Sequence, residues 1–250
     1  MAYAFSDICM VLGIYFVAAF AKGITGLGFS TACLPMLVLI FGLKPTLPLL
    51  IIPSIASNLI VMKQAGEFRI TLQQFWPLYI VQIPGLFLGL WLLIWLAPYI
   101  GTAILGMVLI IYCLFALSNP EFLLSNRLKK LLALPTGFVT GVINGLTGSQ
   151  VMPVLPYMLS LGLRPSRFIQ AINCSFTLSS VLMTLGLIKL ELMTIEAALL
   201  SIVGLLPVYF GAKRGGKLRE RVAPAVFRKL VLILLILMGC VLAGQFLFNH

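Results

Sequence analysis

Two glycine-rich stretches, each flanked by polar side chains, interrupt segments of the chain that are otherwise strongly apolar. Their residues that could contact a ligand are Lys22, Gly23, Thr25, Gly26, Gly28 and Ser30 in the first stretch, and Asn144, Gly145, Thr147, Gly148, Ser149 and Gln150 in the second. Glycine costs a helix roughly 1 kcal/mol relative to alanine, so both stretches are predicted to break a helix. A helix that starts after such a break presents free N–H groups and the positive end of its dipole. The pattern therefore favours binding of an anion.

Lys22 is the one charged residue that lies far from any predicted loop. A charged side chain at membrane depth indicates a functional role by default, and a cation suits an anionic ligand. The corresponding position in the second stretch is Asn144, so the predicted site is asymmetric. Two other interpretations stay open. Lys22 could extend to the membrane surface, and the glycines could serve close packing of helices.

Polar residues also follow each break at helical spacing. They are Ser54, Ser57 and Asn58 after the first break, and Gln170, Asn173, Thr177 and Ser180 after the second. Residues at this spacing share one face of a helix, and in lipid a polar face must point inward. Contacts between helices explain these faces as well as ligand binding does. Ser57, Asn58, Asn173 and Thr177 are included in the predicted binding site.

The composition indicates an integral membrane protein. Of 250 residues, 61% are hydrophobic and only 9% are charged, whereas soluble domains contain about 25% charged residues. Most of the net charge of +11 lies in short loops between apolar segments. This fits the excess of Lys and Arg in cytoplasmic loops better than it fits binding of nucleic acid. The expected surroundings are membrane lipid, and no nucleic-acid partner is expected.

The sequence does not support metal or cofactor chemistry. Isolated cysteines stand at Cys9, Cys33, Cys113, Cys174 and Cys240. Such cysteines behave as small apolar residues, and the only histidine is His250, so ligands for a metal are not clustered. We expect neither metal nor cofactor. The lack of an internal histidine and of carboxylates at mid-depth also argues against an enzyme.

Apolar segments divide the chain into eight parts. We predict a hairpin at 8–41 with spans at 46–64, 72–96 and 99–117, then a hairpin at 131–162 with spans at 167–188, 194–212 and 225–248. About 20 residues suffice to cross a bilayer, and the two hairpin segments are longer. Glycines divide each of them into arms of about 14–16 residues, or roughly 21–24 Å, which is too short to cross. Each is therefore expected to enter the membrane and return to the same side.

The distribution of Lys and Arg favours these hairpins. If all eight segments crossed once, basic residues would lie on both sides with only a weak bias. With two re-entrant hairpins, only Lys44 and Lys189 lie opposite the other loop cations, as the positive-inside rule requires. We therefore expect both termini outside a cell (inner) membrane and the basic loop 213–229 in the cytoplasm.

Each half then contains a hairpin and three spans, an odd number of crossings. Residues 1–120 and 121–250 are therefore predicted to form two inverted repeats of an all-α integral membrane protein. Short matches support the repeat: Ile24-Thr25-Gly26 with Leu146-Thr147-Gly148, Gly42-Leu43-Lys44-Pro45-Thr46 with Gly162-Leu163-Arg164-Pro165-Ser166, and Pro84 and Gly89 with Pro207 and Gly211.

The glycine-rich breaks and the Gly-Leu-(Lys/Arg)-Pro joints resemble those of the sulfite exporter TauE/SafE family, over essentially the whole chain. Where members usually carry a run of glycines after the first Gly-x-x-Gly, this chain has Gly28-Phe29-Ser30 and Gly148-Ser149-Gln150. The resemblance implies a membrane permease for sulfite, sulfonates or related small anions.

The sequence and the resemblance together predict a secondary transporter that moves a small anion, a sulfur oxyanion or an organosulfonate, by alternating access. Its site is expected where the two hairpin tips meet near the midplane. A passive anion channel is the nearest alternative, and a membrane-embedded enzyme or assembly factor is a more distant one. The oligomeric state, the direction of transport and the coupling ion stay open.

Overall fold

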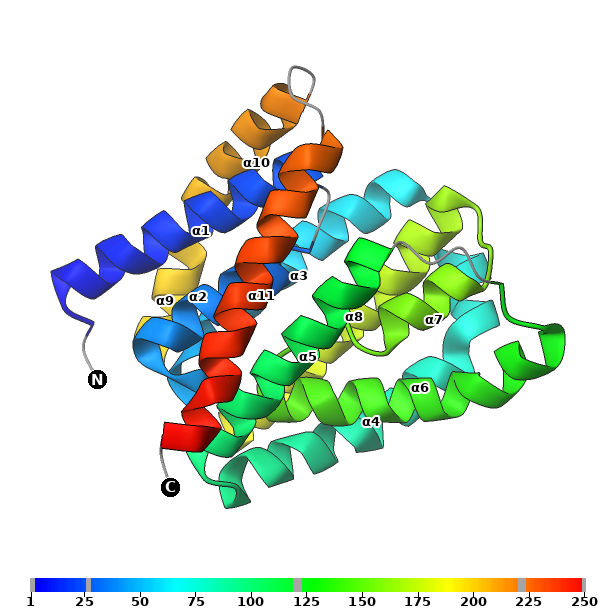
Figure 1. The fold of residues 1–250 in the computed structure, drawn as a ribbon, viewed down its shortest axis with the longest axis horizontal. Helices are drawn as coiled ribbons and strands as arrows, with labels where there is room; N and C mark the ends of the chain where they lie inside the picture. Colours follow the sequence, from blue (N-terminus) through cyan, green and yellow to red (C-terminus); the bar gives the residue numbers. More distant parts are fainter. Residues whose placement is uncertain (1–2, 26–27, 119–122, 220–223, 249–250) are drawn as a thin grey trace.

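The structure is a computed structural model that describes residues 3–25, 28–118, 123–219 and 224–248 (Figure 1). Its first half contains α1 (Phe5–Thr25), α2 (Phe29–Phe41), α3 (Leu43–Ala65), α4 (Phe68–Trp95) and α5 (Pro98–Ser118). Its second half contains α6 (Asn126–Thr147), α7 (Val154–Ser160), α8 (Pro165–Lys189), α9 (Ile195–Val203), α10 (Leu205–Arg219) and α11 (Pro224–Phe248). The all-α prediction is confirmed for these residues.

Seven helical segments of the described chain are long and apolar enough to cross a membrane. They are α1, α3, α4, α5, α8, the α9–α10 run and α11. Helix α2 is apolar but has only 13 residues, short of the roughly 20 that a crossing needs. The protein is therefore a multi-span membrane protein, as its composition predicted.

The two broken segments do not have the expected arms of similar length. Helix α1 has 21 residues and α2 has 13, while α6 has 22 and α7 only 7. The predicted length fails for α6 because this helix begins ahead of the apolar run, where the side chain of Ser125 caps it by accepting from the Leu128 amide. The second arm of this hairpin starts only at Val154, several residues after the glycine-rich stretch that ends at Gln150, and this late start shortens it.

The basic segment 213–229 is mostly helical rather than a loop. Helix α10 continues to Arg219 and α11 begins at Pro224, while residues 220–223 lie outside the described part. Lys and Arg are good helix formers, so a helix can extend past its apolar stretch. The predicted span 194–212 is also divided into α9 and α10 at Gly204, which packs against the ring of Tyr15.

Two pairs of helices pack closely through glycines, α4 with α6 and α1 with α10 (Figure 1). In the first pair, Gly89 faces the Val142 carbonyl and the Cα atom of Gly145. In the second pair, Gly215 faces the Phe20 carbonyl and the Cα atom of Gly23. Because glycine has no side chain, the backbones approach directly, as is common between membrane helices.

The same contacts recur one turn earlier in both pairs. Gly85 faces the Phe138 carbonyl, and Gly211 faces the Phe16 carbonyl. These contacts match Gly85 with Gly211 and Gly89 with Gly215. The sequence matched Gly89 with Gly211 instead, so the glycine contacts favour a register of the predicted repeat that differs by one helical turn.

Helix α3 of the first half and helix α8 of the second half run in opposite directions where they touch. Along α3 and α8, Met62 contacts Thr177 at 3.4 Å, and just beyond the end of α3 the carboxylate of Glu67 accepts bonds from Ser166 (2.6 Å) and Arg167 (2.9 Å). These bonds lower the pKa of Glu67, with the Ser166 hydroxyl as the largest cause.

Helices α5 and α11 are likewise antiparallel and lie side by side in Figure 1. The rings of Tyr99 and Phe246 lie 6.0 Å apart, Gly106 packs against the Ala243 amide, and Ile110 packs against Gly239. The pairs α1–α10 and α4–α6, in contrast, are parallel, because residue numbers rise together along their contacts.

Contacts with α1 and α9 compensate for a proline inside α3. Pro53 has no N–H, so the carbonyl of Leu49, four residues earlier, loses its helical partner. The Tyr15 hydroxyl donates to this carbonyl, and the Ser201 hydroxyl donates to it at 2.9 Å. A free carbonyl in the membrane interior is costly, so these bonds hold α3 against both helices.

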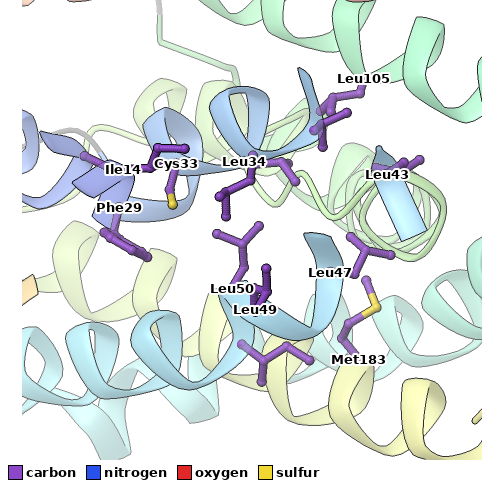
Figure 2. Close-up of a cluster of buried hydrophobic side chains, with 14 of the residues drawn as sticks. Ile14, Phe29, Cys33, Leu34, Leu43, Leu47, Leu49, Leu50, Leu105 and Met183 are labelled. Carbon is purple, nitrogen blue, oxygen red and sulfur yellow. The ribbon is translucent and has the colours of Figure 1, made fainter. Parts of the chain in front are cut away.

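Helix α2 lies at the centre of the larger hydrophobic core, shown in Figure 2. Leu34 of α2 faces Leu50 of α3, and Leu47 of α3 lies beside Met183 of α8. A different contact joins α4 to α8: the buried amide of Gln82 donates to Ser179 and accepts from Ser175 at 3.0 Å. These contacts fix α3 and α8 around the ends of the two broken segments.

Candidate functional site

The two glycine-rich breaks meet at one small pocket of about 20 Å³. Its walls come from the start of α2, from α3, from the α6–α7 connection and from α8. The lining residues are Ser30, Leu47, Leu50, Ile51, Ser54, Asn144, Gly148, Gln150, Ser180 and Met183. Six of the ten lining residues are therefore polar or glycine, in a part of the molecule otherwise packed with leucines.

Hydrogen bonds attach each break to the long helix that follows it. The hydroxyls of Ser30 and Ser54 bond to each other, which joins α2 to α3. The Gln150 side-chain amide donates to the Ser180 hydroxyl at 2.9 Å, which joins the second break to α8. Both bonds place hydroxyl groups at the pocket wall, where their remaining donor capacity is available to a ligand.

Asn144 is the most unusual residue of the pocket. Its side chain is 1% exposed, and within the described chain neither Nδ2 nor Oδ1 has a hydrogen-bond partner. Leaving a buried amide unpaired costs about 1–3 kcal/mol, and natural proteins rarely keep such a group without a use. An amide in this state is ready to exchange hydrogen bonds with a small polar ligand.

The backbone around Asn144 explains how the side chain reaches the pocket. Gly145 lets α6 approach α4 through the carbonyl of Leu86, so the end of α6 lies deep among its neighbours. Gly148 then ends the helix in the left-handed conformation at φ 76°, and its amide bonds to the Asn144 carbonyl at 2.7 Å. The chain therefore leaves the helix one helical turn after Asn144, and both Asn144 and Gly148 line the pocket.

The pocket contains dipoles but no formal charge. Each of its lining residues is uncharged, and Ser30 lies in the first turn of α2, whose 13-residue length gives it a positive N-terminal end. Helix α7 makes no such contribution, because it has seven residues and Val154 is not part of the pocket wall. The predicted anion site at a helix N-terminus therefore applies to α2 alone.

The chain was compared with known proteins. The model of the family Sulfite exporter TauE/SafE matches residues 11–242. The chain belongs to this family. No curated protein and no solved structure matches it. The match includes every residue of the pocket and all the helices that form it.

Membership makes the chain a TauE/SafE permease, a membrane transporter rather than a soluble protein. Four of its residues predicted from sequence line the pocket, namely Ser30, Asn144, Gly148 and Gln150. The structure thus brings together residues from both breaks, more than 100 positions apart in the chain.

The structure adds six residues to the pocket of this TauE/SafE permease. Ser54 and Ser180 belong to the polar helix faces identified from the sequence, but they were not included in the predicted binding site. Leu47, Leu50, Ile51 and Met183 had no signal of their own, because an apolar residue in an apolar helix is unremarkable.

Lys22 of the permease lies away from the pocket wall. The next residue, Gly23, packs against Gly215 and Gly216 of α10. The described residues offer its ammonium group no hydrogen bond or ion pair, and it does not line the pocket. Its assignment to the substrate stays a prediction, as does the alternative of a lysine that extends to the membrane surface.

Other predicted residues of the permease form structural contacts. The Thr147 hydroxyl donates to the Ile143 carbonyl at 2.6 Å and accepts from the Ser149 amide at 3.2 Å, which closes the turn after α6. Gly23 and Gly145 lie at the tight helix pairs. These contacts do not test whether the same residues also reach a substrate.

The remaining predicted residues lie on α2, α3 and α8 or outside the described part. Gly28 precedes α2, Ser57 donates to the Ser54 carbonyl at 3.1 Å, and Asn58 is buried on α3. Asn173 donates to the Ile169 carbonyl, and Thr177 contacts Met62. The side chain of Thr25 and the residue Gly26 lie outside the described part.

Proposed function

We propose that this permease is a secondary transporter that moves a small anion, a sulfur oxyanion or an organosulfonate, by alternating access. The observation that carries the proposal is the buried, unpartnered amide of Asn144 in a pocket where both helix breaks meet. Hydroxyls of Ser30, Ser54 and Ser180 and the start of α2 supply further donors for an oxyanion. A small set of aimed polar groups in an apolar wall is typical of a ligand site.

The proposed architecture is a pair of inverted repeats, residues 1–120 and 121–250. Support comes from the antiparallel contacts of α3 with α8 and of α5 with α11, and from the matching glycine contacts of the pairs α1–α10 and α4–α6. Corresponding helices that run in opposite directions are what inversion requires. Rocking of such repeats against each other would expose the pocket to the two sides in turn.

The proposed orientation has both termini outside a cell (inner) membrane and the basic 213–229 segment in the cytoplasm. It predicts that single cysteines at Lys44 and Lys189, introduced into a cysteine-free background, react with an impermeant maleimide on intact cells. Cysteines at Lys63 and Arg164, at the opposite ends of α3 and α8, should react only after permeabilisation. Labelling of Lys44 and Lys189 from different sides would contradict the inverted arrangement.

Transport itself is tested with purified protein in liposomes. Uptake of labelled sulfite should saturate with concentration, and unlabelled sulfite inside the vesicles should accelerate it by counterflow, because a carrier returns its site with each cycle. Protein-free liposomes give the background. Uptake that rises linearly with concentration and shows no counterflow would indicate an anion channel. Absence of uptake both of sulfite and of an organosulfonate would refute the proposal.

A further inference from the structure

We infer that the pocket takes its oxyanion in a singly charged, singly protonated form, such as hydrogen sulfite, and discriminates against fully ionised dianions. The inference rests on the proposed function and concerns the chemistry of the same pocket. It follows from two observations: the pocket wall carries no cation, and Asn144 presents an unpaired donor and an unpaired acceptor together.

The charge of the wall limits the charge of the ligand. Transfer of an ion from water to a protein interior is strongly unfavourable unless the ion is paired and hydrogen-bonded. The penalty rises steeply with charge, and the ten lining residues supply only dipoles. Neutral donors and one helix N-terminus can compensate for one negative charge far better than for two.

The hydrogen-bonding groups of the wall define the ligand further. In the bonded pair of Ser30 and Ser54 one hydroxyl donates, so the proton of the other is free. The Ser180 hydroxyl accepts from Gln150, so its own proton can also point at a ligand. These two protons and the Asn144 N–H groups match the bare oxygens of an oxyanion.

The side-chain oxygen of Asn144, Oδ1, has the opposite requirement. It can only accept a hydrogen bond, and it is buried without a donor among the described residues. A fully ionised oxyanion has no proton to donate, so one of its negatively charged oxygens would face the partly negative Oδ1 of Asn144 and repel it. A protonated oxyanion presents one O–H for Oδ1 and several acceptors for Nδ2 and the hydroxyls, so it satisfies the whole wall.

The test measures the KM for sulfite in proteoliposomes over a series of pH values that covers the ionisation of hydrogen sulfite. Expressed as total sulfite, KM is expected to rise about tenfold for each pH unit above that ionisation. Expressed as hydrogen sulfite, it is expected to stay constant. Sulfate, a dianion throughout the range, is expected not to compete. Methanesulfonate, a fixed monoanion, should inhibit with the same inhibition constant at every pH, but more weakly than hydrogen sulfite binds, because it has no O–H for Asn144 Oδ1.

The outcomes separate this inference from the proposed function. Saturable uptake with a KM that is constant in total sulfite, or competition by sulfate as strong as that by methanesulfonate, would overturn the inference and leave the transporter standing. Inhibition by methanesulfonate that weakens with pH in parallel with sulfite would also overturn it, because a group of the protein would then be titrating. Absence of saturable uptake at every pH would refute the proposed function itself.

Discussion

Replacement of Asn144 by leucine is expected to lower kcat/KM for the transported anion at least 100-fold, or by about 2.7 kcal/mol. Leucine has nearly the shape of asparagine, so the pocket keeps its form but loses its buried donor and acceptor. The same change removes an unpaired polar group from the interior. We therefore expect the melting temperature in detergent to stay the same or rise, because burying an unpaired amide is unfavourable.

The matched control is Asn126→Leu, at the exposed first residue of the same helix. It makes the same chemical change outside the pocket and should leave uptake within about twofold of the unaltered protein. A variant Asn144→Leu that transports normally would show that the pocket is not the substrate site. One that melts earlier would show that the amide has a structural partner.

The second large effect is expected at the close contact of α4 and α6. A Cβ atom at Gly145 would overlap the carbonyl of Leu86 and approach the amide of Leu90 at 2.7 Å. Both are backbone atoms that cannot move aside without separating the helices. We expect Gly145→Ala to reduce stability by about 3 kcal/mol, at the upper end of overpacking effects, although alanine is the better helix former.

The measurement is thermal unfolding of purified variants in detergent. Gly13→Ala in α1 is the control, because a Cβ atom there meets nothing within 4 Å and the change should be neutral or stabilising. Gly23→Ala probes the equivalent contact between α1 and α10, where the Cβ atom would lie 2.5 Å from the Ala212 carbonyl. Equal tolerance of all three changes would disprove the glycine-mediated packing of both pairs.

The pocket of a TauE/SafE permease thus depends on the same glycines that hold the helices together. Gly145 brings α6 against α4, and Gly148 turns the chain one residue after Thr147. Asn144 directly precedes Gly145 in α6. Its side chain lines the pocket and has no hydrogen-bond partner among the described residues. The packing interpretation of the glycines is therefore supported at Gly145, and the binding role proposed for Asn144 lies one residue away.

The sequence by itself determined the class of the protein, the family and the places where its helices break. Hydropathy and helix propensity are local properties, so low charge and clustered glycines indicate a membrane protein with interrupted helices wherever the chain folds. Asn144 and Gln150 could be identified for the same reason, because a polar residue beside a glycine-rich break is recognisable from the local sequence alone. The lengths of the hairpin arms could not be predicted in the same way, because the cap at Ser125 starts α6 ahead of its apolar run.

Only the tertiary structure decided which of the polar residues share a pocket. Ser30 and Ser54 meet Asn144 because α2 and α3 pack beside the end of α6, and Lys22 is kept away because Gly23 packs on Gly215. The register between helices distant in the chain depends on many weak contacts at once, such as those of Gly85 with the Phe138 carbonyl and of Gly211 with the Phe16 carbonyl. A single sequence carries no direct record of those contacts, since each depends on the shape of the partner helix as much as on its own residues.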